Sequence, residues 1–102
     1  MINAKQEFLK VIENQKLICA IVEYTRVQGF DFKFELSTNH SLTELEFFLD
    51  QLDFEYEPYC SNRDPQFSGT IWMNGCWAER ESVYGFEHWK VYSRPPIPES
   101  LG

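Results

Sequence analysis

The dipeptide Asn74-Gly75 restricts the fold more than any other feature of the chain, because it separates two runs of alternating apolar and polar residues. Asn and Gly tolerate the positive φ that both positions of a two-residue hairpin turn require. Such a turn places Trp72 opposite Trp77 on neighbouring antiparallel strands. A second turn at Tyr84-Gly85 places Trp77 opposite Tyr92. The last third of the chain is therefore predicted to form two successive β-hairpins.

Two earlier segments have the composition and periodicity of strands. Leu17 to Tyr24 is apolar nearly throughout and rich in branched residues, which is typical of a central strand covered on both faces. In Phe30 to Leu36, apolar residues alternate with charged ones, which is the period-2 pattern of a half-buried strand. Gly29 marks the turn between these two strands.

Two other segments carry helix signals. Asn3 to Gln6 has the form of a capping box, and apolar residues then recur at helical spacing from Phe8 until about Asn14. Ser41 to Glu44 is a second capping box. The second helix is expected to direct one apolar face toward the core, made of Leu42, Leu45, Phe48, Leu49 and Leu52.

The predicted elements follow one another in the order α-β-β-α-β-β-β, which indicates an α+β fold. We expect an antiparallel sheet with both helices packed against it. With 102 residues the chain has the length of a single domain, 1–102, with one modest core. Residues 94–102, which include Pro95-Pro96, are expected to form an extended, proline-rich tail.

Composition favours a cytoplasmic protein without membrane contact. No apolar run approaches the roughly 20 residues that a membrane-spanning helix needs, and the chain does not open with the pattern of a secretion signal. The three cysteines, Cys19, Cys60 and Cys76, have no paired spacing and are expected to be reduced thiols.

The negative charge is concentrated in one segment. The chain has a net charge of −7, and neither lysine nor arginine occurs between Lys33 and Arg63. In the second helix, Glu46, Asp50 and Asp53 are spaced so that they share the face opposite the apolar one. We expect one continuous acidic surface, made of Glu44, Glu46, Asp50, Asp53, Glu55 and Glu57.

The residues that would support a reaction or a bound cofactor are few. Of the two histidines, His40 is expected in a solvated loop, and His88 is expected to pair with Glu81 across two strands at the surface. The pattern of a zinc site, a calcium loop, a Walker motif or a dinucleotide motif does not occur, so we expect no metal and no cofactor. Direct binding to nucleic acid is not expected, because it needs clustered Lys and Arg.

The final third resembles a set of small uncharacterised proteins from phages and prophages. The resemblance covers roughly half of the chain and implies a phage or mobile-element gene that is expressed in a bacterial cytoplasm. It carries over no catalytic residue. The residues that support it are Leu52-Asp53-Phe54-Glu55-Tyr56, Gly69-Thr70-Ile71-Trp72, Asn74-Gly75, Trp77, Glu79-Arg80, Tyr84-Gly85, Glu87, Trp89 and Pro96-Ile97-Pro98-Glu99.

These observations favour a non-enzymatic protein that binds a partner. The leading hypothesis is a phage-type inhibitor whose acidic surface mimics nucleic acid. It would bind a basic host protein such as a CRISPR effector or a restriction enzyme. The alternative is an interaction module that uses the exposed aromatic face of the hairpins, with the acids serving solubility only. That face is expected to consist of Trp72, Trp77 and Tyr92. A small enzyme that uses His88 with Glu81 or a cysteine is the third class.

Overall fold

The computed structural model describes residues 1–13, 15–26, 30–59, 66–93 and 100. Three features of the sequence analysis lie outside the described residues: the turn at Gly29, the thiol of Cys60 and, apart from Ser100, the proline-rich tail. The described residues form an α+β fold with two helices, a five-stranded antiparallel sheet and a two-stranded sheet. The elements are β1 (Ile2–Asn3), α1 (Ala4–Val11), β2 (Leu17–Arg26), β3 (Phe30–Leu36), α2 (Leu42–Gln51), β4 (Glu55–Tyr56), β5 (Phe67–Met73), β6 (Cys76–Val83) and β7 (Phe86–Ser93).

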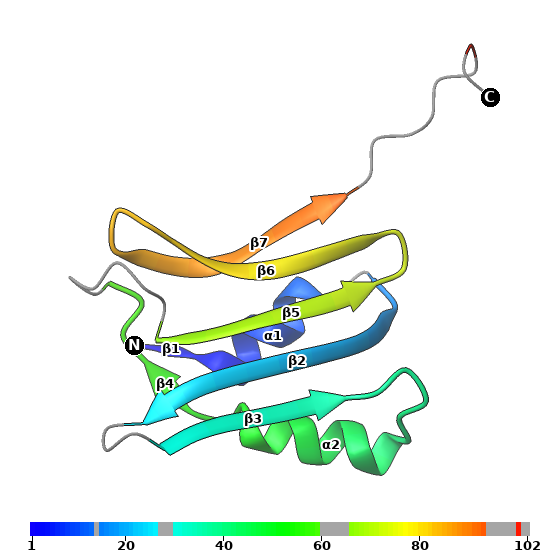
Figure 1. The fold of residues 1–102 in the computed structure, drawn as a ribbon, viewed down its shortest axis with the longest axis horizontal. Helices are drawn as coiled ribbons and strands as arrows, with labels where there is room; N and C mark the ends of the chain where they lie inside the picture. Colours follow the sequence, from blue (N-terminus) through cyan, green and yellow to red (C-terminus); the bar gives the residue numbers. More distant parts are fainter. Residues whose placement is uncertain (14, 27–29, 60–65, 94–99, 101–102) are drawn as a thin grey trace.

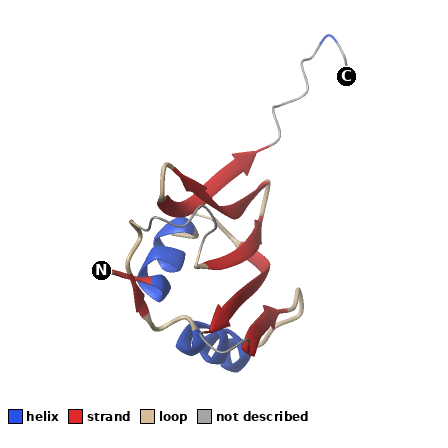
Figure 2. Ribbon diagram, turned by 60° about the vertical axis from the view of Figure 1, so that its left-hand side comes forward, coloured by secondary structure: helices blue, strands red, loops and turns tan. Residues whose placement is uncertain are grey.

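The large sheet has the strand order β3-β2-β5-β6-β7, and both helices lie on the same side of it (Figure 1, Figure 2). We call the side that faces the helices the inner face and the other side the outer face. The inner face carries the core, in which Phe8, Val22 and Ile71 are fully buried. The predicted fold class is therefore confirmed, including the packing of both helices against the sheet.

The central position of β2 is confirmed, since β2 pairs with β3 on one side and with β5 on the other. Its predicted burial on both faces is wrong. Ala20 and Val22 are buried on the inner face, whereas Glu23 is exposed on the outer face and Ile21 is half-buried there. The physical reason is that both helices pack on one side, which leaves β2 covered on that side alone.

The two hairpins have the predicted register. Trp72 pairs with Trp77, and Trp77 pairs with Tyr92. The backbone of the first turn differs from the expectation, because only Gly75 (φ 86°) has positive φ there, and Asn74 does not. The backbone N–H of Asn74 instead donates to the carbonyl of Lys16, which ties the turn to the start of β2. In the second turn both Tyr84 (φ 52°) and Gly85 (φ 80°) adopt the left-handed region.

Helix α2 begins with the predicted capping box, in which the Glu44 N–H donates to Ser41 Oγ and the Ser41 N–H donates to Glu44 Oε1. Its predicted apolar face is correct for Phe48 and Leu52, which are buried, but wrong for Leu42, which is 79% exposed. Leu42 is the first residue of the helix, and this end of α2 reaches past the end of β3 (Figure 1), which leaves the start of the helix with less of the sheet beside it.

The first helix is shorter than predicted, because it ends at Val11 and not near Asn14. Before it, β1 pairs with β4 in a small sheet that the sequence did not reveal. Asn3 has two roles at this junction. Its side chain accepts from the Gln6 N–H to cap α1, and its Nδ2 donates to Asp53 Oδ1 at 2.9 Å. Asn3 therefore links the start of α1 to the chain that follows α2.

Candidate functional site

The acidic surface predicted from sequence lies on α2 and on the segment that follows it. All six carboxylates, Glu44, Glu46, Asp50, Asp53, Glu55 and Glu57, belong to exposed residues. Helix α2 has no basic residue in its last turn. In the described part of the chain, no Lys or Arg forms an ion pair with any of the six.

Three of these acids also hold local structure. Glu44 belongs to the capping box, Asp53 accepts from Asn3, and Glu57 Oε1 accepts from the Tyr59 N–H at 3.2 Å. The carboxylates of Glu46, Asp50 and Glu55 form no hydrogen bond or ion pair among the described residues, and we call these three residues the free acids.

An exposed aromatic side chain lies among these carboxylates. Phe47 is 66% exposed, although a phenylalanine on a helix normally belongs to the core. It is three residues from both Glu44 and Asp50, and residues three apart are neighbours on a helix surface. The hydrophobic periodicity had assigned the apolar face to other residues, so sequence reasoning missed Phe47. Together, Phe47 and the six acids form what we call the α2 surface.

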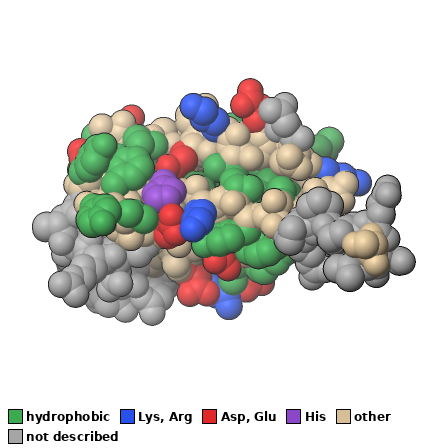
Figure 3. All heavy atoms as spheres, turned by 90° about the horizontal axis from the view of Figure 1, so that it is seen from above, with side chains coloured by type: hydrophobic (Ala, Val, Ile, Leu, Met, Phe, Trp, Pro, Cys, Tyr) green, Lys and Arg blue, Asp and Glu red, His purple; other side chains and the backbone are tan. Residues whose placement is uncertain are grey.

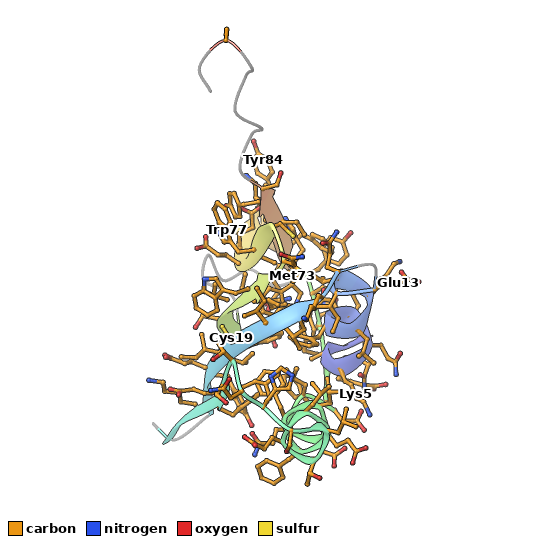
Figure 4. All side chains as sticks on the ribbon, turned by 90° about the vertical axis from the view of Figure 1, so that its right-hand side faces the viewer. Lys5, Glu13, Cys19, Met73, Trp77 and Tyr84 are labelled. Carbon is orange, nitrogen blue, oxygen red and sulfur yellow. The ribbon has the colours of Figure 1, made fainter. Side chains whose placement is uncertain are left out.

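The aromatic residues of the alternative hypothesis lie together on the outer face, as their alternation predicts. The rings of Trp77 and Tyr92 are stacked, with centroids 5.5 Å apart and an interplanar angle of 12°. Trp72 is the most open of the three at 43% exposure. Figure 4 shows Cys19 and Trp77 on one side of the sheet, and Lys5 and Glu13 on the other side with α1.

The histidines occupy the positions expected from sequence. His88 Nε2 lies 2.8 Å from Glu81 Oε1, which confirms the cross-strand pair, and its ring stacks on Phe86. Viewed from the β7 side, a histidine lies beside a group of hydrophobic side chains, with acidic and basic side chains close to it (Figure 3). His40 lies in the loop before α2 and donates from Nδ1 to the Ser37 carbonyl at 2.7 Å. Among the described residues, no three potential ligand side chains gather as a metal site.

A buried group of charges that sequence reasoning missed lies between α1 and the hairpins. Arg80 Nη1 donates to Glu7 Oε1 at 2.8 Å, and Arg80 Nη2 donates to Glu87 Oε1 at 2.7 Å. The side chains of Arg80 and Glu87 are 0% and 2% exposed. The guanidinium also lies 3.9 Å from the centre of the Phe67 ring. Each Nη atom of the buried guanidinium thus has an acidic partner, whereas Arg80 Nε is buried without a hydrogen-bond partner among the described residues.

Two further residues complete this network. The Tyr56 hydroxyl donates to Glu7 Oε1 at 2.6 Å and accepts from Arg80 Nη2 at 3.3 Å. Burial, followed by the hydrogen bond to Glu7, raises the pKa of Tyr56. Gln66 donates from its backbone N–H and from Nε2 to Glu87 Oε2, both at 3.1 Å. Because the ionic centre of the network is closed to solvent, we interpret the network as structural.

The alternation along β6 contained a signal for this network. Trp89 belongs to the inner face, and Arg80 pairs with Trp89, so Arg80 points to the core as well. A charged residue at a core position predicts a buried acid as its partner. The sequence does not indicate which acid, because Glu7 is separated from Arg80 by 73 residues.

Comparison of the chain with protein-family models, with curated proteins and with solved structures found no match. The phage-family resemblance therefore stays a prediction. In the described part of the chain, neither helix has the length and apolar character needed to cross a membrane.

Proposed function

We propose that this protein is a non-enzymatic inhibitor of the kind that phages carry, and that it binds a host nucleic-acid-processing or defence protein in the bacterial cytoplasm. The α2 surface is its binding site. The exposed ring of Phe47 among carboxylates is the observation that carries this proposal. An aromatic anchor surrounded by polar groups is the typical arrangement of an energetically important interface residue.

The charge of the α2 surface defines the partner. Glu46, Asp50 and Glu55 are exposed and lack basic partners among the described residues, so they are available to arginine and lysine side chains of another protein. A basic groove that holds phosphates offers such side chains. Occupation of that groove by carboxylates would exclude the nucleic acid, and the complex would weaken as salt screens the attraction.

The test is affinity capture from a bacterial lysate at low and at high salt, followed by identification of the captured proteins. The variant Glu46→Lys/Asp50→Lys reverses two of the free acids. Asp53 and Glu44 are left intact because they hold Asn3 and the helix cap. The control Glu13→Lys/Glu79→Lys changes the net charge by the same amount at exposed positions away from α2.

We expect the wild type and the control to capture a basic nucleic-acid-binding protein that high salt releases, and the α2 variant to capture none. Equal capture by both variants would show that the α2 surface is not the binding site.

The exposure of Trp72 favours a second candidate function, an interaction module that binds its partner through the outer face. In that case, capture resists high salt and is lost in Trp72→Ala, while Glu46→Lys/Asp50→Lys retains it. The lysate experiment therefore separates the two candidates.

A further inference from the structure

A hollow of about 480 Å³ opens on the outer face, where β2 extends beyond the end of β3. The pairing of β2 with β3 ends at Ala20 and Leu36, whereas the pairing of β2 with β5 continues to Leu17. Among the described residues, Cys19 therefore has β5 as a neighbour on one side but not β3 on the other. The chain turns away from the sheet here, toward the start of α2.

The residues that line this hollow are partly apolar and partly acidic. Cys19 and Ile21 of β2 are half-buried, and with the exposed ring of Trp72 they form an apolar portion. Glu35 and Glu44 are the acidic residues of the lining, and Glu44 Oε1 also accepts from the Ser41 N–H in the capping box. Glu35 Oε1 lies 3.3 Å from Lys33 Nζ, but both side chains are more than half exposed, so this pair is weak and open to exchange. We call this site the Trp72 hollow.

A group that matches these walls has an apolar stem and a cationic end. An arginine side chain has both, since its methylene groups pack on apolar surface while the guanidinium reaches a polar rim. The guanidinium also stacks on indole rings and binds carboxylates with two parallel hydrogen bonds. Lysine carries the same charge but lacks the planar fork, so it fits this combination of tryptophan and carboxylates less well.

The geometry points to the Trp72 hollow as a binding site for an arginine side chain that the basic partner supplies. This inference rests on the proposed function, because both require a basic partner, but it uses a different surface. Glu44 belongs to both surfaces, so the α2 surface and the hollow adjoin at the start of α2. A basic partner that covers α2 therefore has the hollow within reach.

The experiment is a titration with the synthetic peptide Ac-Gly-Arg-Gly-NH2 up to millimolar concentration, followed in ¹H–¹⁵N spectra. The matched probe replaces arginine with citrulline, which has nearly the same shape and no charge. We expect the arginine peptide to shift the Trp72 indole resonance and the Cys19 amide, and the citrulline peptide to leave both in place. Trp72→Ala and, separately, Glu35→Gln are expected to weaken binding at least fivefold. Glu35→Gln tests the site even if Trp72→Ala fails to fold.

Each outcome separates this inference from the proposed function. Shifts confined to the amides around Phe47, or equal shifts with the citrulline peptide, would refute the Trp72 hollow as an arginine site. Neither result would contradict the α2 surface as the binding site of the partner. Shifts at Trp72 that persist in Glu46→Lys/Asp50→Lys support the hollow, even if the same variant still captures the partner and the proposed function fails.

Discussion

The guanidinium of Arg80 and the carboxylate of Glu87 form an ion pair of 2.7 Å in the interior of the protein, closed to solvent on both sides. The pair joins β6 to β7, and Glu7 extends it to α1. The described pairing of β5 with β6 covers Thr70–Met73 and Cys76–Glu79. Arg80 is therefore the first residue of β6 after this pairing ends.

Removal of one partner from this pair is expected to destabilise the protein strongly. Arg80→Ala leaves the buried carboxylate of Glu87 without its counter-ion, and we expect a loss of about 3–5 kcal/mol in the free energy of unfolding. The measurement is urea denaturation followed by circular dichroism. The control Arg80→Met/Glu87→Gln removes both charges and keeps an acceptor for Gln66, so its loss should be clearly smaller. An equal loss in both proteins would mean that packing, and not the unpaired charge, sets the cost.

Stability is expected to fall at alkaline pH because of Tyr56. The pKa of Tyr56 is raised in the folded protein, whereas a tyrosine of the unfolded chain has a pKa of about 10. The stabilisation linked to Tyr56 is therefore fully present below about pH 10 and is lost as the pH rises further. Tyr56→Phe should be less stable by about 1 kcal/mol at neutral pH, because it lacks the hydrogen bond to Glu7.

The measurement is the free energy of unfolding of wild type and of Tyr56→Phe, taken by urea denaturation between pH 8 and about pH 11. The difference between the two proteins should narrow above about pH 10. Tyr84→Phe is the matched control, because the fully exposed Tyr84 ring has the same surroundings in the folded and unfolded states. Parallel curves for wild type and Tyr56→Phe would refute the assignment to Tyr56.

The second hairpin turn stores backbone strain at Tyr84. Its φ of 52° lies in the left-handed region, which is unfavourable for a residue with a bulky Cβ substituent. The side chain is fully exposed, so its replacement loses no packing. Tyr84→Asn should raise the free energy of unfolding by about 1 kcal/mol, because Asn-Gly is the preferred pair for such a turn. Tyr84→Phe keeps the strain and should leave stability unchanged, whereas a similar gain in both variants would rule out the backbone explanation.

Phe47 is expected to matter for binding and not for folding. Since its side chain is 66% exposed, Phe47→Ser should change the free energy of unfolding by less than about 0.5 kcal/mol. If Phe47 anchors the partner, the affinity should fall about tenfold or more. Leu42→Ser is the matched control on the same helix, because Leu42 is 79% exposed and lies five residues before Phe47. Titration of the captured partner measures both affinities, and unchanged affinity in Phe47→Ser would remove this residue from the site.

The sequence was sufficient wherever the structure depends on near neighbours. The capping box at Ser41, the pairing of Trp72 with Trp77 and the pairing of His88 with Glu81 all follow from turn positions and alternation. The exposure of the six acids follows from helical and strand periodicity in the same way. These features involve residues that are close in the chain or in fixed register, so local rules decide them.

Contacts between distant segments were not predictable in this way. The position of Phe47 in solvent and of Leu42 beyond the end of β3 depends on where α2 meets the sheet. The partnership of Arg80 with Glu7 and Tyr56 depends on how α1 and β4 pack against the hairpins. Periodicity assigns a residue to a face, but it does not state which element covers that face.

The sequence by itself thus determined both helices, the five strands of the large sheet, the hairpin register and the concentration of negative charge in one segment. The tertiary structure alone decided that both helices cover one side of the sheet, which leaves Trp72 and the adjoining hollow open on the other side. It also decided that a buried arginine joins β6, β7 and α1. The physical reason is that burial depends on the packing of whole elements, and packing is a property of segments that lie far apart in the chain.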